Sequence, residues 1–247
     1  MSATTFPLSA QRALITGGSR GIGLAIAQHL ARLGASTLLV SRDPSTLSTA
    51  SSTLPLLHSS QTHSTHAGTV SSPQLWQHLK THKDISILIN AAGITHSSLL
   101  ATTPADTIAD VLNTNLLGTI LACQAMSSQM VRRRGGVIVN IGSVLGLEKP
   151  GVGATAYAAS KAGVVGFSRA LAAEVGRRGV RVNTVVPGFV ETEMVAARVE
   201  GMRERGVRVG SAEEVADAVG FLVRNEGMQG AEIVIDGGLR WGVGEKL

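Results

Sequence analysis

Residues 13–23 read ALITGGSRGIG, and the expected fold of the chain follows from this segment. The apolar residues 13–16 predict a buried strand, and the spacing of apolar residues over 22–33 predicts a helix. Glycines between a strand and a helix let the backbone turn tightly and approach a pyrophosphate, while the helix N-terminus offers free N–H groups. Any tight turn uses glycine, but a turn in this setting predicts a dinucleotide site. The expected contacts are Gly17, Ser19, Arg20, Gly21, Ile22 and Gly23.

Short apolar runs alternate with helical patterns along the rest of the chain, which predicts βαβ units and a parallel sheet. Unbroken runs such as Val137-Ile138-Val139 are typical of strands covered on both faces. We therefore expect the α/β fold class, with a doubly wound Rossmann parallel sheet of about seven strands and helices on both faces. The expected strands are residues 13–16, 36–40, 64–69 (weakly), 85–90, 136–141, 180–186 and 232–235. The expected helices are residues 22–33, 104–131, 157–175 and 212–223.

The 247 residues fit one domain over 1–247, with an N-terminal extension at 1–11 and a short substrate lid at 189–211. Pro104 at a first helical position, after Thr102 or Thr103 as N-cap, predicts one helix start. Ser211 with Glu214 three residues later predicts another. Residues 44–72 are crowded with Ser, Thr and His, so we expect a poorly defined helix there and the weak strand.

Composition excludes several classes of function. The chain has one Cys, Cys123, which excludes an internal disulfide and predicts a buried packing residue in a reducing compartment. The formal net charge is +5, but seven aromatic residues are too few for a single-strand nucleic-acid binder. His63/His66 and His78/His82 lack a Cys or carboxylate cluster, so we expect no metal. Without a signal peptide or an apolar run of about 20 residues, we expect the cytoplasm or mitochondrial matrix, not secretion.

The residues after the second expected strand bear on the choice of cofactor. An acidic side chain there binds the ribose of NAD, whereas an Arg receives the 2′-phosphate of NADP. Ser41-Arg42-Asp43 occupies this place, and Asp43 precedes Pro44, which is typical of a turn. We expect Ser41 to leave space and Arg42 and Arg20 to converge on the phosphate, which predicts NADPH/NADP+. The alternative is that both arginines are solvated surface residues.

Tyr157 and Lys161 predict proton transfer. They are four residues apart, so they share one helix face, and Tyr157 is the only Tyr in the chain. A phenol loses its proton near pH 10, and a nearby ammonium is expected to lower that pKa. Ser143, at the end of the strand over 136–141, can hydrogen-bond a carbonyl oxygen. The structural alternatives are a packing aromatic at Tyr157 and a strand-end cap at Ser143.

Five features follow one another along the chain: TGGSRGIG at 16–23, NAAG at 90–93, Ser143, Tyr157-x-x-x-Lys161 and Pro187-Gly188. Together they resemble the short-chain dehydrogenase/reductase family over nearly the whole chain. One departure concerns adenine, because the family often has Asp-Val after its third strand and this chain has Thr69-Val70. We therefore expect a backbone group or a hydroxyl, and not a carboxylate, to contact the adenine.

The resemblance implies roles for individual residues. Tyr157 would donate a proton to a carbonyl oxygen, Ser143 would polarise that oxygen, and Lys161 would also hold the nicotinamide ribose. Asn115 resembles the family's helix Asn that anchors a proton relay to Lys161, although a satisfied buried amide is the alternative; Asn113 is expected on the helix surface. The implied catalytic residues are Asn115, Ser143, Tyr157 and Lys161. Further implied cofactor contacts are Asn90, Ala91, Ala92, Gly93, Tyr157, Lys161, Pro187, Gly188, Val190 and Thr192.

Within the family, residues 17–23, 113–118, 157–163, 167–172 and 187–194 resemble 3-oxoacyl-[acyl-carrier-protein] reductases of fatty acid synthesis and related mitochondrial carbonyl reductases. The resemblance implies a homotetramer and an acidic carrier-protein partner. Candidate docking residues are Arg132, Arg133, Arg134, Arg177 and Arg178, with a solvated basic face as the equal alternative. Two other functions stay open: a broader NADPH-dependent carbonyl, quinone or secondary-metabolite ketone reductase, and a non-catalytic NADPH-binding subunit.

Overall fold

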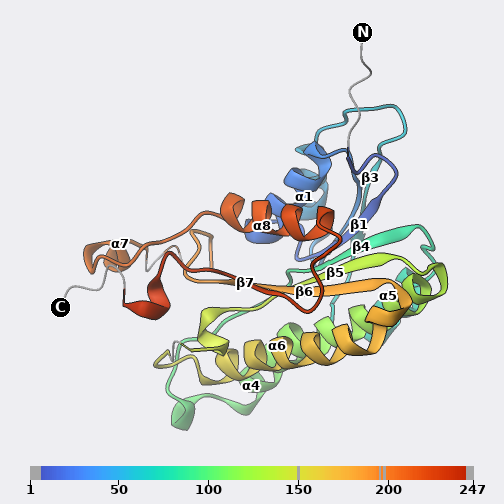
Figure 1. Cartoon of the computed structure of the whole chain (residues 1–247). Helices are drawn as coiled ribbons and strands as arrows, with labels where there is room; N and C mark the ends of the chain where they lie inside the picture. The colour runs from blue at the N-terminus through green and yellow to red at the C-terminus, as the bar shows by residue number, and fades with distance from the viewer. Residues whose placement is uncertain (1–6, 149–150, 195, 197–198, 243–247) are drawn as a thin grey trace.

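A computed structural model of the chain describes residues 7–148, 151–194, 196 and 199–242. Seven parallel strands form one sheet in the order β3-β2-β1-β4-β5-β6-β7 (Figure 1). The expected doubly wound α/β fold is therefore confirmed. The strands are β1 (Arg12–Thr16), β2 (Ser36–Ser41), β3 (His63–Ala67), β4 (Ile85–Asn90), β5 (Gly136–Ile141), β6 (Val180–Pro187) and β7 (Glu232–Ile235).

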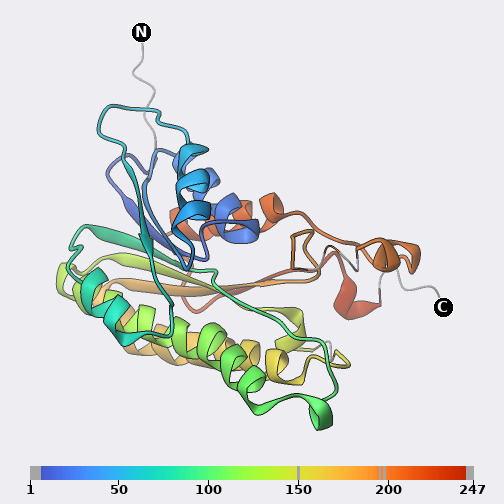
Figure 2. The same cartoon turned by 180° about the vertical axis from the view of Figure 1, so that it is seen from behind.

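Helices cover both faces of the sheet, as the views from the two sides show (Figures 1 and 2). One core lies under α1 (Gly21–Arg32), α2 (Pro44–Ser52) and α8 (Ala212–Arg224). The other lies under α3 (Pro73–Leu79), α5 (Gly118–Arg133) and α6 (Thr155–Val175). Successive strand residues alternate between these cores, because side chains on a strand point to opposite faces. The remaining helical segments are α4 (Ala105–Leu112), α7 (Val199–Glu204), η1 (Leu100–Thr102), η2 (Asn113–Leu117), η3 (Val144–Gly146), η4 (Gly176–Arg178) and η6 (Leu239–Trp241).

The prediction of a single helix over residues 104–131 is wrong, because the segment is not one continuous α-helix. A π-helical turn, η2, interrupts it between α4 and α5. Pro104 lies at the N-cap position of α4, and the Thr103 hydroxyl donates to the Leu99 carbonyl, so Thr103 does not cap the helix. The wider turn places Asn115 in the interior, fully shielded from solvent. Such turns are frequent at functional sites.

Residues 44–72 are better ordered than the sequence predicts. Asp43 caps α2, because its carboxylate accepts a hydrogen bond from the Ser45 N–H at 2.9 Å, and Pro44 follows it in the first turn. The helix α3, which the sequence analysis missed, begins at Pro73 and buries Trp76. Its signal was the Ser72-Pro73 start, which the Ser-rich surroundings obscured.

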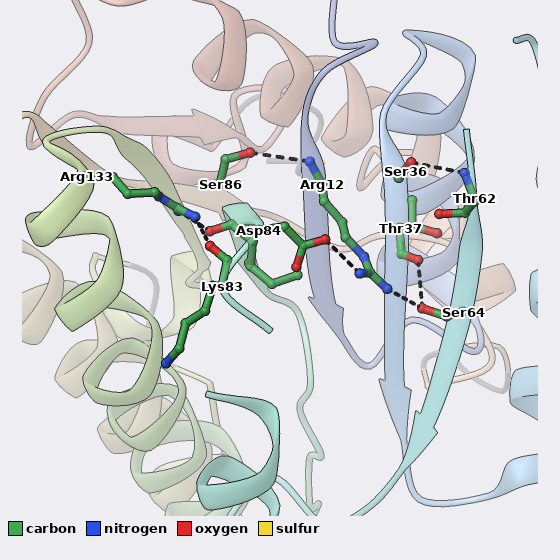
Figure 3. A network of polar contacts seen from close by, with 10 residues as sticks. Arg12, Ser36, Thr37, Thr62, Ser64, Lys83, Asp84, Ser86 and Arg133 are labelled. Atoms are coloured by element: carbon green, nitrogen blue, oxygen red, sulfur yellow. Dashed lines mark hydrogen bonds and ion pairs between the residues drawn. The ribbon is translucent and has the colours of Figure 1, made fainter. Parts of the chain in front are cut away.

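A polar network links the amino ends of the strands (Figure 3). Arg12 at the start of β1 donates to Asp84, just before β4, and to Ser64 of β3, both at 2.8 Å. Arg133 at the end of α5 donates to the carbonyls of Lys83 and Ile85. These contacts fix the positions of β1, β3 and β4 relative to one another at the amino edge of the sheet.

A second polar network lies inside the protein, between the sheet and α6. The amide nitrogen of Asn90 donates to Asn140, whose own amide nitrogen donates to Ser168 of α6, each at 2.8 Å. Cys123 contacts both asparagines and is fully buried, which confirms it as a packing residue; burial raises the pKa of its thiol to about 12. The network fixes where α6 lies on the sheet, since its polar groups have no access to water.

Replacing Asn140 with Ala should lower the free energy of unfolding by about 1–3 kcal/mol, because the buried Asn90 amide loses its oxygen acceptor. The Ser168 hydroxyl loses the Asn140 donor but keeps its own bond to the Val164 carbonyl. Urea unfolding followed by circular dichroism measures this. The control is Ser128→Ala on the exposed face of α5, expected to change stability by at most about 0.5 kcal/mol. Equal stability of the two variants would contradict a role for the network.

Candidate active site

A cleft of about 670 Å³ opens at the carboxyl edge of the sheet. It lies where β1 has β2 on one side and β4 on the other, so the chain reverses its direction of winding there. Open α/β sheets bind ligands at such a point. Twelve of the residues expected to bind cofactor line this cleft: Gly17, Ser19, Arg20, Gly21, Ile22, Gly23, Ser41, Arg42, Ala91, Ala92, Gly93 and Thr192.

The glycine loop needs glycine for reasons of space. A Cβ at Gly23 would lie 2.2 Å from the Gly17 carbonyl oxygen, and one at Gly17 would lie 2.8 Å from the Ala92 Cα. Gly17 also has a φ of +67°, which other residues rarely adopt. The hydroxyl of Thr16 accepts the N–H groups of Ala91 and Ala92, at 3.1 and 3.2 Å, so the two loops are held together.

The N-terminus of α1 faces the same cleft. Its N-cap residue, Arg20, makes no side-chain capping bond, and its first turn carries no acidic residue. The N–H groups of that turn and the positive end of the helix dipole suit an anion. The cleft therefore fits the pyrophosphate of a dinucleotide.

Arg20 and Arg42 both line the cleft, and their convergence on a phosphate stays a prediction. The Arg20 guanidinium forms an ion pair with Glu193, 2.8 Å from Nη1 to Oε2. Arg42 is exposed beside the cleft and, within the described part of the chain, forms no ion pair. Thr69 also lines the cleft, which leaves its hydroxyl or backbone available where the family often has Asp. The sequence showed no reason to pair Arg20 with a residue so distant along the chain.

Six expected cofactor contacts lie outside the cleft lining: Tyr157 and Lys161, which lie on α6, and four others. The Asn90 side chain points into the interior network, so it is structural. Pro187 ends β6, the Gly188 N–H donates to the Ile235 carbonyl at 2.8 Å, and Val190 is buried. These three residues position the start of the lid, whose Thr192 lies against Gly21. Asn113 is exposed, as expected for a helix-surface residue, and it also lines the cleft.

Tyr157 and Lys161 lie on one face of α6, at the end of β5. The Lys161 Nζ is 5.8 Å from the centre of the Tyr157 ring and donates to the Ile141 carbonyl at 2.8 Å. Ser143 lies one residue beyond Gly142, which follows that strand, and its Oγ accepts the Leu145 N–H at 3.2 Å. Gly146 allows η3 to pack on α6, since a Cβ there would lie 2.7 Å from Lys161. Ser143 thus caps a turn and also reaches Tyr157.

Burial governs the protonation of both groups. It lowers the pKa of Lys161 to about 8, because a buried ammonium loses its hydration. Burial also raises the pKa of Tyr157, and the interaction with the Ser143 hydroxyl lowers it by less. The expected acidification of Tyr157 by Lys161 is therefore wrong for the protein alone. The phenol keeps its proton at neutral pH.

Asn115 links the two halves of the site. Its amide nitrogen donates to the Ile94 carbonyl at 2.9 Å and to the Ser160 hydroxyl at 3.0 Å, while its oxygen accepts the Ile94 N–H at 2.8 Å. A Cβ at Gly93 would lie 3.4 Å from the Asn115 Oδ1 and 3.6 Å from the Lys161 Nζ. Gly93 also lines the cleft, so the Asn115 amide and the Lys161 amine lie at the inner end of the cleft. Ser160 was missed by the sequence analysis.

The arginines considered for carrier docking lie at the other edge of the sheet. Arg132, Arg133 and Arg134 precede β5, and Arg177 and Arg178 precede β6. A Cβ at Gly179 would lie 2.6 Å from the Arg134 carbonyl oxygen, so the two groups are close together. A six-residue strand, about 20 Å, separates them from Ser143. Figure 3 shows Arg133 engaged with the backbone at that edge.

The described residues contain neither a membrane-spanning helix nor a cluster of metal ligands. No helix among them is long and apolar enough to cross a bilayer. In the same part of the chain, no three His, Cys, Asp or Glu side chains gather as metal ligands. The rings of His66 and His78 stack on each other, with 4.8 Å between ring centres.

The chain has a Rossmann-type sheet with a glycine-rich turn after β1, and a Ser, a Tyr and a Lys lie beside the end of β5. This arrangement is typical of nicotinamide-dependent oxidoreductases. The chain belongs to the short-chain dehydrogenase family, whose model matches residues 11–203.

The chain is similar to characterised relatives over most of its length. It is 40% identical to a 3-oxoacyl-[acyl-carrier-protein] reductase of Rattus norvegicus, over 92% of this chain and 96% of that protein. It is 39% identical to carbonyl reductase family member 4 of Danio rerio, over 92% and 97%. A crystal structure of a 3-oxoacyl (acyl-carrier-protein) reductase from Agrobacterium tumefaciens with NADP bound superposes with a TM-score of 0.84, at 29% identity over 95% and 98%.

The lowered pKa of Lys161 predicts a pH-dependent stability. Between about pH 8 and the ordinary lysine value of 10.5, the unfolded chain retains a proton that the folded chain has lost, so the free energy of unfolding rises with pH. Lys161→Met should abolish this rise, which approaches about 1.4 kcal/mol per pH unit. Urea unfolding of both proteins from pH 7 to 10 measures it. A constant difference between them across this range would show that Lys161 titrates normally.

Proposed function

We propose that the protein reduces the ketone of a 3-oxoacyl thioester with NADPH, as a 3-oxoacyl-[acyl-carrier-protein] reductase. The observation that carries this proposal is the position of Gly93, which lines the nucleotide cleft and lies against the Lys161 amine and the Asn115 amide. This proximity supports a role for Lys161 and its neighbour Tyr157 at the end of the cleft where a nicotinamide would be held.

The chain's own residues supply the proton and the orientation, and NADPH, when bound, supplies a hydride to the carbonyl carbon. Ser143 donates a hydrogen bond to the carbonyl oxygen and polarises it. Tyr157 donates its proton to that oxygen as the carbon is reduced. The raised pKa of Tyr157 keeps the proton in place until then. Lys161 stabilises the phenolate that remains and returns a proton to it, for which its pKa of about 8 is well matched.

The preference for NADPH rests on Ser41 and Arg42. Both line the cleft at the carboxyl end of β2, where the ribose of a dinucleotide would lie. The serine hydroxyl bonds to Ser19 of the glycine loop at 3.0 Å, and the Arg42 guanidinium is free of ion pairs within the described residues. An unengaged guanidinium at this place suits a 2′-phosphate.

Arg42→Ala should weaken NADPH binding about tenfold or more and leave NADH binding unchanged, because only NADPH carries the 2′-phosphate. Isothermal titration calorimetry with both nucleotides measures this. Arg132→Ala, at the opposite edge of the sheet, serves as the control and should bind both nucleotides as the wild type does. An unchanged NADPH affinity in Arg42→Ala would overturn the proposed cofactor preference.

The thioester substrate is favoured by the names of the relatives. Several proteins at 38–41% identity are called 3-oxoacyl-[acyl-carrier-protein] reductase. The second candidate is a broader carbonyl, quinone or secondary-metabolite ketone reductase, which the relative named carbonyl reductase family member 4 favours. The grouping of Ser143, Tyr157 and Lys161 disfavours a non-catalytic NADPH-binding subunit.

Tyr157→Phe should reduce the rate of acetoacetyl-thioester reduction at least about 100-fold while leaving NADPH affinity within about twofold, because it removes only the proton donor. NADPH oxidation at 340 nm is measured with acetoacetyl thioester and with a panel of free ketones and quinones. Faster reduction of the panel by the wild type would favour the second candidate. Near-normal turnover by Tyr157→Phe would overturn the mechanism.

We further propose a homotetramer in the cytoplasm or mitochondrial matrix. Support for assembly comes from exposed apolar side chains on two helical surfaces, Leu117 of η2 and Phe221 of α8. The five arginines at the amino edge do not enter the proposal, because a carrier protein docked there would face away from the cleft.

A further inference from the structure

The lid begins directly on the phosphate-binding loop. Thr192 lies over Gly21, where an added Cβ would be 3.3 Å from the Thr192 methyl carbon. The next residue, Glu193, forms the ion pair with Arg20 at 2.8 Å. Arg20, Thr192 and Glu193 line the cleft together with Arg42. One guanidinium at the phosphate end of the cleft is therefore engaged by the lid.

The Arg20–Glu193 pair is easily broken. The two side chains are 65% and 73% exposed, and ion pairs in water of this kind contribute little stability. In the described part of the chain, neither side chain has another hydrogen-bond partner. The Glu193 carboxylate accepts a single guanidinium N–H of Arg20, so a phosphate, with its larger charge and two N–H bonds to the same guanidinium, can displace it.

We propose that Glu193 is a specificity-determining residue, whose carboxylate competes with the 2′-phosphate of NADPH for the Arg20 guanidinium. NADH lacks that phosphate and leaves the ion pair in place. Glu193 therefore reduces the affinity for NADPH and leaves the affinity for NADH unchanged. The ratio of the two affinities, which is the preference for NADPH, becomes smaller. The inference rests on the proposed NADPH dependence.

The lid contains a matched control. Glu191, two residues earlier, pairs with Arg203 at 2.6 Å, and both of these side chains are 56% exposed. This pair joins two parts of the lid and does not line the cleft. Glu191→Gln and Glu193→Gln thus remove the same charge from the same segment, but only the second frees a guanidinium at the phosphate end.

The test measures dissociation constants for NADPH and NADH by isothermal titration calorimetry at low ionic strength. Glu193→Gln should bind NADPH about two- to fivefold more tightly than the wild type, the size expected for an exposed ion pair. Its NADH affinity, and both affinities of Glu191→Gln, should stay as in the wild type. The gain should be lost in an Arg20→Gln background, because the two substitutions act on one interaction.

Other outcomes overturn the proposal in distinguishable ways. If Glu193→Gln raised the affinities for NADPH and NADH equally, the change would be due to the lid and not to the 2′-phosphate. If Glu191→Gln had the same effect as Glu193→Gln, the change would be due to overall charge. Weaker or unchanged NADPH binding by Glu193→Gln, with a wild type that prefers NADPH, would overturn this inference alone. A wild type that binds both nucleotides equally would overturn the proposed NADPH dependence and this inference with it.

Discussion

The buried amine of Lys161 organises the candidate site. It is enclosed by protein and donates to the Ile141 carbonyl, so α6 is held at the carboxyl end of β5. An ammonium in such surroundings is costly, and its lowered pKa is the measure of that cost. The positions of Tyr157 on the same helix, and of Gly93 against the amine, depend on this attachment.

The two edges of the sheet have different tasks. At the amino edge, Arg12, Asp84 and Arg133 link strands to one another and to α5. The carboxyl edge carries the cleft, an uncapped helix N-terminus and the exposed Arg42. At the amino edge the polar groups pair with one another, whereas at the carboxyl edge they are available to a ligand. This arrangement suits a parallel sheet that binds its ligand at the switch point.

Interior polar contacts make the site rigid. The Asn90–Asn140–Ser168 chain fixes α6 on the sheet, and Asn115 fixes the backbone at Ile94 beside the cleft. The π-helical turn η2 is what turns Asn115 inward, since it displaces the residues of that turn relative to a regular helix. The catalytic proposal for Tyr157 relies on this rigidity, because proton transfer requires close and constant geometry.

The parallel sheet, the glycine loop and the pairing of Tyr157 with Lys161 could be predicted from the sequence, because they follow from local periodicity and spacing. The packing of the helices and strands fixes which side chains meet across distant segments. It engaged Arg20 with Glu193, turned Asn90 into the interior, and set the pKa of Tyr157 by burial, which no spacing reveals. Contacts between segments far apart in the chain, and the loss of water around them, arise only when the elements pack.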